Sequence, residues 1–274
     1  MVIVNSVLSG CYTCVTPGTS LSVYVTNSDV HDSKFFIYNR LQRTNVALSI
    51  EDSTFDVLDY IMYVEFYQAV TQVSIEVRNS SLIARRTNSF VISGAFNDMP
   101  LSYINVTVRD SFVSYAIDIR TCSSHVTFDV QNCTCYGIRI TSASTNALIH
   151  GNPFPTRYGD HISIRFCDAS SELAQMELPH QVTISNNSFP SKAPATGAVL
   201  SINAEDTQAL NHVVVVSDNH FLPSMDQYRR GIYILSASND RLHSYTIASN
   251  RFTNMGGEAI RVFGVMVYFE LTMD

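Results

Sequence analysis

Along most of the chain, apolar and polar residues alternate in short segments that each close on a small polar residue. Apolar residues stand two and four positions before each closing residue, as Ile184 and Val182 do before Asn186. Because successive side chains of a strand point to opposite faces, this period of two predicts strands with one buried face. The pattern recurs ten times, and its closing residues are Asn5, Asn27, Asp52, Asn79, Asp110, Asn132, Asp168, Asn186, Asp218 and Ser249.

A turn and a second strand follow most closing residues. Three positions after the closing residue stands another apolar side chain, such as Phe189 or Phe221, and Ser171 is the exception. The intervals between closing residues range from 18 to 36 residues. A single unit of this kind cannot bury its apolar face, whereas stacked units share a continuous core. The repeat therefore predicts an all-β fold, a parallel β-solenoid of about ten coils.

The segment Val182-Thr-Ile-Ser-Asn-Asn-Ser-Phe189 resembles the coils of right-handed parallel β-helix proteins of the pectin-lyase-like type, and the likeness covers nearly the whole chain. In that fold, stacked Asn or Asp side chains form a ladder at one turn. The resemblance therefore implies a right-handed helix whose closing residues form such a ladder, with their side chains pointing into the structure. It implies a fold and no particular activity.

Degenerate coils of the form Val-x-Ile-x-Asn-x-x-Phe, together with scattered sequons and cysteines, are also similar to the dispersed-gene-family surface proteins of trypanosomes. Those proteins are very large, membrane-attached and regarded as adhesive. This second resemblance implies that the chain is a short segment of a longer, membrane-associated surface glycoprotein.

We expect residues 1–274 to form a single domain. Its first apolar pair is Met1 and Ile3, and Ile260–Leu271 is the most apolar stretch of the chain. Terminal coils of a solenoid expose apolar edges unless polar caps cover them. With no cap evident at either end, the sequence predicts a solenoid that continues or that associates with neighbouring solenoid segments. A self-capped helix with twisted terminal coils is the alternative.

Composition narrows the class of partner. The chain has 274 residues, a formal charge of -7 and only two lysines, so it offers no broad basic surface for nucleic acid. No apolar run approaches the roughly 18 residues that a membrane span needs. The first residues also lack the charged and apolar regions of a signal peptide. The chain is therefore either cytosolic or part of a longer extracellular or cell-surface protein, and the second interpretation agrees with the resemblance.

Two groups of residues are candidates for ligand binding or catalysis. Arginines lie in or beside expected strands, and their outward stacking would build a cationic strip suited to an acidic glycan. A merely solvated face is the alternative. These arginines are Arg120, Arg139, Arg165 and Arg261. The second group lies in His150–His161, which is expected to form a long loop, and long loops often carry functional residues.

Arg139, Asp160 and His161 are the candidates for anion binding and acid–base chemistry in a carbohydrate-active enzyme. The Asp-Asp and Gly-His-Gly motifs of β-helix hydrolases are missing, and so are the dense carboxylate clusters that polysaccharide cleavage uses. No calcium-binding loop is present either. We therefore expect no metal and no cofactor.

Cysteine spacing is compatible with cross-linked coils. Cys122, Cys133 and Cys167 fall in neighbouring coils and would form cross-coil disulfides in an oxidising compartment, with the connectivity open. Cys135 is expected in the core. Cys11-x-x-Cys14 stands without a second pair, which is weak evidence for a zinc or redox site.

Four sequons begin at Asn79, Asn105, Asn132 and Asn186. Asn105 falls in an outward phase of its strand and is the expected glycosylation site. The other three are closing residues, which the ladder arrangement would point inward.

These observations favour a non-catalytic β-solenoid segment of a surface or extracellular protein that binds a glycan or a protein on another surface. Two alternatives stay open. One is a carbohydrate-active β-helix enzyme, either a polysaccharide lyase or a glycoside hydrolase. The other is a structural spacer that binds no ligand.

Overall fold

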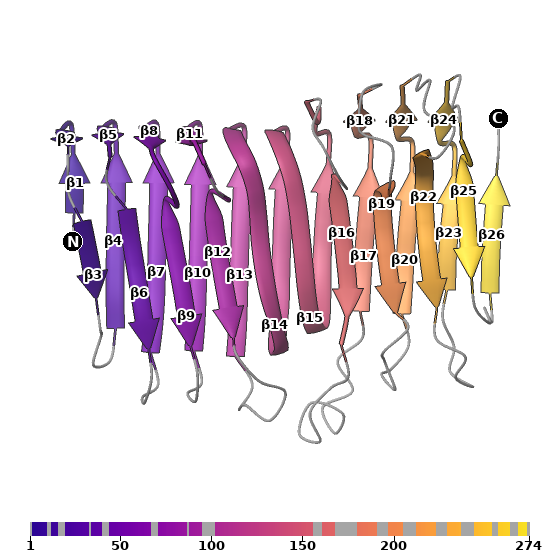
Figure 1. Cartoon of the computed structure of the whole chain (residues 1–274), viewed down its shortest axis with the longest axis horizontal. Helices are drawn as coiled ribbons and strands as arrows, with labels where there is room; N and C mark the ends of the chain where they lie inside the picture. The colour runs from indigo at the N-terminus through magenta and orange to yellow at the C-terminus, as the bar shows by residue number, and fades with distance from the viewer. Residues whose placement is uncertain are drawn as a thin grey trace.

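The computed structural model describes residues 2–9, 12–15, 20–32, 34–39, 44–66, 71–86, 88–94, 102–155, 161–167, 180–190, 197–204, 212–222, 229–236, 244–253, 257–263 and 268–272. Strands β1 to β26 form the regular structure of these residues, and no helix occurs among them. The strands are stacked in chain order along the long axis, from the N-terminus at one end to the C-terminus at the other (Figure 1).

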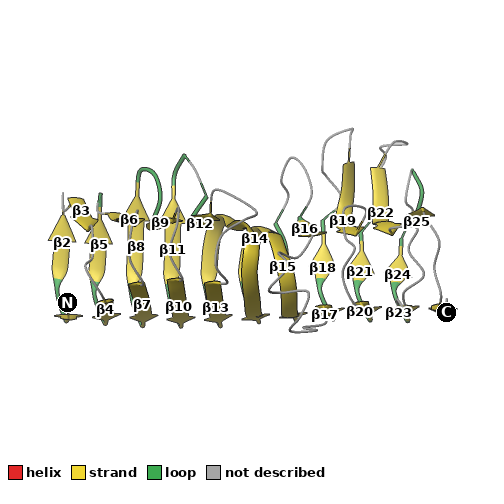
Figure 2. Ribbon diagram, turned by 90° about the horizontal axis from the view of Figure 1, so that it is seen from below, coloured by secondary structure: helices red, strands yellow, loops and turns green. Residues whose placement is uncertain are grey.

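Each repeat of the chain, which we call a winding, adds its strands beside those of the winding before it. These strands pair in parallel, in one sheet of 23 strands and another of three. The sequence prediction of an all-β fold with a long parallel sheet is therefore confirmed. Each winding passes through three rows of strands, which we call the first, second and third row. In Figure 2 the second row, with β5, β8 and β11, lies between the other two.

The first row holds the strands that precede the closing residues. Its strands pair in the register that the repeat predicts, because Val23 lies opposite Leu48 and Leu48 lies opposite Ile75. The row comprises β1 (Val2–Val4), β4 (Ser20–Thr26), β7 (Thr44–Glu51), β10 (Thr71–Arg78), β13 (Ser102–Arg109), β17 (His180–Ser185), β20 (His212–Ser217), β23 (Ser244–Ala248) and β26 (Tyr268–Thr272).

The second row holds short strands directly after the turn. It comprises β2 (Val7–Ser9), β5 (Asp29–His31), β8 (Thr54–Val57), β11 (Ser81–Ala84), β18 (Ser188–Phe189), β21 (His220–Phe221) and β24 (Arg251–Phe252).

The third row completes each winding. It comprises β3 (Tyr12–Val15), β6 (Lys34–Asn39), β9 (Met62–Phe66), β12 (Phe90–Gly94), β16 (Ile162–Phe166), β19 (Gly197–Ala204), β22 (Arg229–Ser236) and β25 (Ile260–Phe263). Two long strands, β14 (Phe112–Gln131) and β15 (Thr134–His150), run through all three rows without a break in strand structure.

The core lies between the rows and consists of the inward phase of every strand. In β13 the residues alternate strictly, with Ile104 and Val106 buried and Tyr103 and Asn105 exposed. The residue two positions before every closing residue is buried, from Ile3 to Ile247. Burial of this continuous aliphatic face is the main favourable contribution to folding.

The closing residues adopt the left-handed backbone region that turns the chain out of the first row. Nine of the ten have positive φ, among them Asn27 at 46° and Asn186 at 54°. Asn and Asp tolerate this region better than other residues with a side chain, which explains their recurrence. Their side chains are exposed, so the expectation that they point into the structure is wrong. Hydrogen bonds link Asn27 Nδ2 to Asn5 Oδ1 at 2.6 Å and Asn132 Nδ2 to Asp110 Oδ1 at 3.3 Å, and a ladder through all ten stays a prediction.

Asp168 is the one closing residue whose assignment changes. It lies outside the described residues, but the strand before it, β16, belongs to the third row. The equivalent turn of that winding is at Gly151, which has φ 67° and donates its N–H to Ser185 O at 3.1 Å. Three positions later stands Phe154, which is buried, whereas Ser171 broke the pattern. A glycine adopts this backbone region without cost and so replaces the expected polar residue.

After every described turn out of the first row except the first, the next residue is buried, and it is polar except at Cys133. We call these residues the buried polar column. Main-chain N–H groups of one winding donate to column side chains of the next. Examples are Ser28 N to Ser53 Oγ at 3.1 Å and Asn187 N to Asn219 Oδ1 at 3.0 Å. Because buried N–H groups must be paired, this column connects the windings at the turn. Its members are Ser28, Ser53, Ser80, Ser111, Cys133, Asn152, Asn187, Asn219 and Asn250.

Aromatic rings stack in the C-terminal half of the core. Phe154, Phe189, Phe221 and Phe252 lie in successive windings, with ring centroids 5.0, 4.9 and 4.6 Å apart and small interplanar angles. The predicted burial of the apolar residue three positions after the turn thus produces a continuous stack of rings. Such offset stacking adds to the burial of apolar area.

We predict that Asn187→Leu destabilises the protein by about 3 kcal/mol, because Asn152 N and Ile149 O lose their buried partners. The neighbouring change Asn186→Gly should shift stability by less than about 1 kcal/mol, since glycine accepts positive φ readily. Urea denaturation of both variants measures the difference. An equal loss of stability in the two variants would contradict a stabilising role of the buried polar column.

We predict that Phe221→Ala costs about 3–5 kcal/mol, because the ring is buried between two others. Phe263→Ala is the control, since Phe263 is 43% exposed, and surface changes usually stay within about 0.5 kcal/mol. Thermal or urea unfolding compares the two. A Phe221→Ala variant as stable as the control would show that the stack does not stabilise the core.

Candidate functional site

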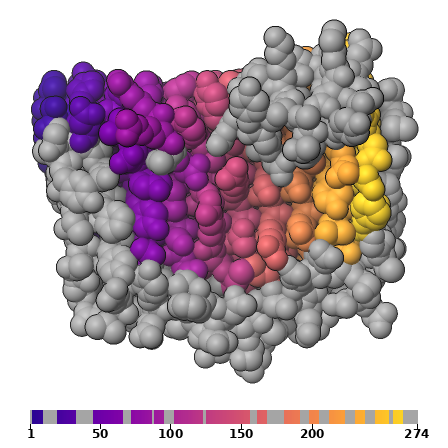
Figure 3. All heavy atoms as spheres, viewed as in Figure 1, coloured from indigo at the N-terminus to yellow at the C-terminus, as the bar shows by residue number. Residues whose placement is uncertain are grey.

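The outward face of the third row contains a pocket of about 360 Å³. Six residues line it, contributed by β9, β12 and β14 and by the turns that precede β9 and β12. Successive windings lie side by side on the face seen in Figure 3, whose colours run in chain order. Residues far apart in the sequence therefore meet here. The lining residues are Tyr60, Tyr63, Asn88, Val91, Ser93 and Arg120.

A buried carboxylate anchors the cationic side of this pocket. The Asp118 side chain has no exposed surface and accepts a two-point contact from Arg120, with Nε to Oδ1 at 2.8 Å and Nη2 bonded to Oδ2. Asn88 Nδ2 donates to the same carboxylate at 2.7 Å. A buried charge needs such partners. The hydrogen bond to Asp118 also raises the pKa of Arg120, whose side chain stays 58% exposed and can contact a ligand.

Two tyrosines form the aromatic side of the pocket. The rings of Tyr60 and Tyr63 are 5.1 Å apart between centroids and inclined by 59°. Both side chains are half-buried, and both line the same pocket as Arg120. Tyrosine presents a rigid apolar ring and a hydroxyl that donates or accepts a hydrogen bond. The pocket thus combines a positive charge held in place with an aromatic surface.

Two further arginines extend the positive charge beyond the pocket. Arg139 lies on β15, opposite Asp118 of β14. Arg165 lies on β16, the next strand, and is level with Arg120 of β14, because both lie opposite Thr141 of β15. Because neighbouring strands lie about 4.8 Å apart, Arg120 and Arg165 are separated by roughly 10 Å of sheet, with Arg139 between their strands. Arg120, Arg139 and Arg165 therefore form one cluster, which we call the arginine cluster.

Arg261, the fourth arginine of the expected strip, lies elsewhere. It stands in β25, at the same level across the strands as Arg139, but four strands further along the third row. Its Nη1 contacts Glu258 Oε2 at 3.2 Å, and Arg230 contacts the same carboxylate at 3.1 Å. The expectation of one strip through all four arginines is therefore wrong.

Of the three residues considered for catalysis, Arg139 and His161 lie on opposite sides of the sheet. Arg139 faces outward on β15, between the buried residues Ile138 and Ile140. His161 has no exposed surface, and its ring lies inside, 5.7 Å from Phe154 and 6.1 Å from Phe189 between ring centroids. The sheet therefore separates His161 from any ligand beside Arg139. Asp160 lies outside the described residues.

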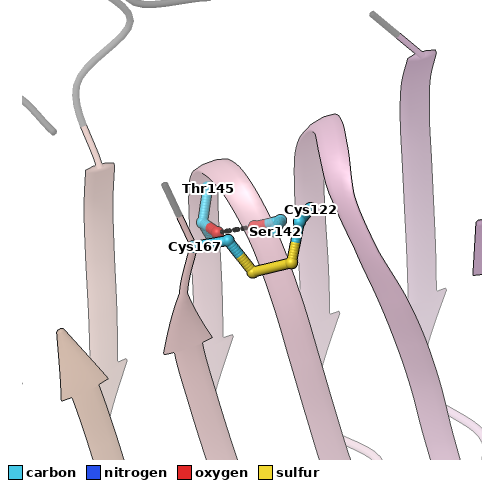
Figure 4. Close-up of a disulfide and its surroundings, with 4 residues drawn as sticks. All are labelled: Cys122, Ser142, Thr145 and Cys167. Atoms are coloured by element: carbon cyan, nitrogen blue, oxygen red, sulfur yellow. Dashed lines mark hydrogen bonds between the residues drawn. A yellow bond between two sulfur atoms is a disulfide. The ribbon is translucent and has the colours of Figure 1, made fainter. Parts of the chain in front are cut away.

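A disulfide joins Cys122 of β14 to Cys167, the residue after β16, with the two Cα atoms 5.3 Å apart. Figure 4 shows the bond beside the bend of β15, where Ser142 and Thr145 are hydrogen-bonded to each other. The bond is one of the cross-coil links that the cysteine spacing allowed. Cys133 and Cys135 are free and buried. Burial raises the pKa of Cys133 to about 11, so this thiol stays protonated and unreactive.

The sequons differ from expectation in their exposure. Asn105 is exposed on the outward face of β13, as predicted. Asn79, Asn132 and Asn186 are exposed at their turns as well, so the expectation that they are inaccessible is wrong. The positive φ of a closing residue points its side chain outward, and the buried position falls to the following residue.

Among the described residues, no group of three or more His, Cys, Asp or Glu side chains is arranged to hold a metal ion. No helix within the described part of the chain is long and apolar enough to cross a membrane. No family model, no curated protein and no solved structure matches the chain.

We predict that the Cys122–Cys167 bond stabilises the protein by up to about 4 kcal/mol, because it closes a loop with a sequence separation of 45 residues in the unfolded chain. Urea unfolding with and without a thiol reductant measures this. A Cys122→Ser/Cys167→Ser variant should show the same loss and no response to reductant. A non-reducing peptide map without this cross-link would contradict the prediction.

Proposed function

We propose that the chain is a right-handed parallel β-helix of about ten coils, with its closing residues at one turn of each coil, and that it binds ligands without transforming them. The parallel pairing of the three rows and the repeated left-handed turn support the fold. The burial of His161, away from Arg139, supports a binding function over a catalytic one.

The ligand that the pocket suits best is an acidic saccharide. The observation that carries this proposal is the exposed Arg120 guanidinium, held by buried Asp118 beside the Tyr60 and Tyr63 rings. A guanidinium carries five N–H donors, and Asp118 takes those of Nε and Nη2 on one edge, so further donors remain for a ligand carboxylate. An aromatic ring packs against the apolar face of a sugar. Because Asp118 already orients Arg120, little side-chain freedom is lost when a ligand binds.

The arginine cluster extends this site to a chain of acidic sugars. Arg139 and Arg165 stand on the next two strands, so a ligand laid across the strands meets a cation on each. The formal charge of the whole chain is -7, which makes a local group of arginines stand out against the rest of the surface. We propose an adhesive protein that presents this face to acidic glycans.

The Cys122–Cys167 bond supports an extracellular or cell-surface location for this activity, since disulfides persist in oxidising compartments. Exposed sequons at Asn79, Asn105, Asn132 and Asn186 agree with that location.

Calorimetric titration with hexagalacturonate and with its fully methyl-esterified form tests the proposal. We expect binding of the acidic form and a loss of roughly tenfold or more in affinity in Arg139→Gln, because a charge-assisted hydrogen bond contributes about 1.5–3 kcal/mol. Arg139 is the residue to change, since Arg120 also compensates the charge of buried Asp118. Arg261→Gln is the matched control and should bind like the parent protein.

Equal affinity for the two forms of the hexamer, or an Arg139→Gln variant that binds like the parent, would contradict an acidic-glycan site. The same samples are then analysed for shortened saccharides. Appearance of cleavage products would overturn the non-catalytic part of the proposal.

A further inference from the structure

A second concavity, of about 370 Å³, lies on the first row, on strands that contribute nothing to the pocket of the third row except β14. It crosses β4, β7, β10, β13 and the last part of β14, which are neighbours in the sheet. We call it the first-row groove. Its lining residues are Leu21, Ser22, Asn45, Val46, Ala47, Gln72, Val73, Ser74, Tyr103, Ile104, Asn105, His125 and Thr127.

Polar side chains line this groove in two rungs that run across the strands. One rung is Asn45, Gln72, Tyr103 and His125, which lie opposite one another in register. The other rung stands two residues further along each strand and comprises Ser22, Ala47, Ser74, Asn105 and Thr127. Outward side chains repeat about every 4.8 Å across strands and about every 7 Å along them. The groove thus presents amide and hydroxyl groups at regular spacing on a lining that also contains the apolar residues Leu21, Val46, Ala47, Val73 and Ile104.

No charged side chain lines the groove. Asp, Glu, Lys and Arg are absent from its lining residues. The ring of His125 is partly buried, and its Nδ1 lies 2.9 Å from Ser144 Oγ. Burial lowers the pKa of His125, so the ring is neutral at physiological pH. The groove therefore differs in charge from the site at the arginine cluster.

Tyr103 provides the aromatic surface of the groove. Its side chain is 40% exposed, and its ring meets that of His125 edge-on with centroids 6.2 Å apart. The contact with His125 restrains the tyrosine ring, and the side chain stays partly exposed. Asn105 stands two residues along the same strand, so an amide lies next to the ring.

A peptide strand cannot add to the sheet here. The N–H and C=O groups of β7, β10 and β13 are already used, because each of these strands is paired on both sides. Strand addition requires a free edge. A ligand must therefore bind through the polar and apolar side chains that line the groove.

We propose that the first-row groove binds a neutral oligosaccharide laid across the strands, with one sugar ring packed on Tyr103. Uncharged hydroxyl groups match the donors and acceptors of Asn45 and Gln72, and a polymer of repeating sugars presents the same groups to successive strands. The protein would then hold two saccharides of different charge on two rows of one solenoid. This site stands independently of the acidic-glycan site, since the two share no lining residue.

The test uses the full chain carrying Thr107→Val. This change removes the sequon at Asn105, whose attached glycan would occupy the groove, and Thr107 is not a lining residue. Cellohexaose, xylohexaose, mannohexaose and hexa-N-acetylchitohexaose are titrated as neutral probes, with hexagalacturonate as the acidic probe. Variants are Tyr103→Ala, Gln72→Ala and the control Tyr24→Ala, a tyrosine that is 50% exposed on the same row but outside the groove.

We expect at least one neutral hexamer to bind and its affinity to fall roughly tenfold or more in Tyr103→Ala and measurably in Gln72→Ala, with Tyr24→Ala unchanged. Unfolding midpoints equal to that of the Thr107→Val parent show that the variants are folded. Binding of hexagalacturonate should be the same in all of them. Failure of every neutral probe, or a Tyr103→Ala variant that binds like the parent, would overturn the proposal. Loss of hexagalacturonate binding alone would concern only the acidic-glycan site.

Discussion

The hydrogen bonds of the buried polar column hold successive windings in one register at the turn where the chain leaves the first row. There the backbone enters the left-handed region for one residue and then places a polar side chain inside, as Asn186 and Asn187 do. Asn187 accepts from Asn152 and donates to Ile149 O and Asn219 Oδ1, so one side chain connects three windings. Without these partners several buried backbone groups would be unpaired, at a cost of about 1–3 kcal/mol each.

Because the register is fixed at the turn, the outward side chains of successive windings are also aligned. Each outward residue stands directly beside its counterparts in the windings before and after, so a rung of side chains forms a continuous surface across the strands. The third row contains a pocket with Arg120 held by Asp118, and the first row contains a groove without charged side chains. Function in such a fold depends on which side chains the register assembles, because the strands of successive windings follow the same three rows.

Sequence periodicity predicted the strands well because alternate residues of each strand are buried. Alternation within each segment and the closing residue together predicted the register of the first row, and nine of ten turns were located correctly. The error at Asp168 has a physical cause. Gly151 meets the conformational demand of the turn without a polar side chain, so a search for Asn, Asp and Ser passes over it. The buried Phe154, three positions later, was the signal that would have found it.

The candidate sites show where sequence reasoning ends. Outward-facing arginines were predicted, but not that Arg261 pairs with Glu258 while Arg120 pairs with Asp118. The inward orientation of His161 depends on its place directly before β16, where its ring packs beside Phe154 and Phe189. Tyr103 and Asn45 are 58 positions apart in the chain and share one rung because of the winding lengths between them.

The sequence by itself determined the all-β class, the parallel repeat, the buried phase of each strand and nearly all of the turns, because these depend on local alternation and on the residue types that tolerate positive φ. Tertiary structure alone decided which residue at the turn is buried, which cysteines pair and which side chains share a rung. Those outcomes depend on the lengths of the loops between strands, which set how distant segments align, and local patterns carry no information about that alignment.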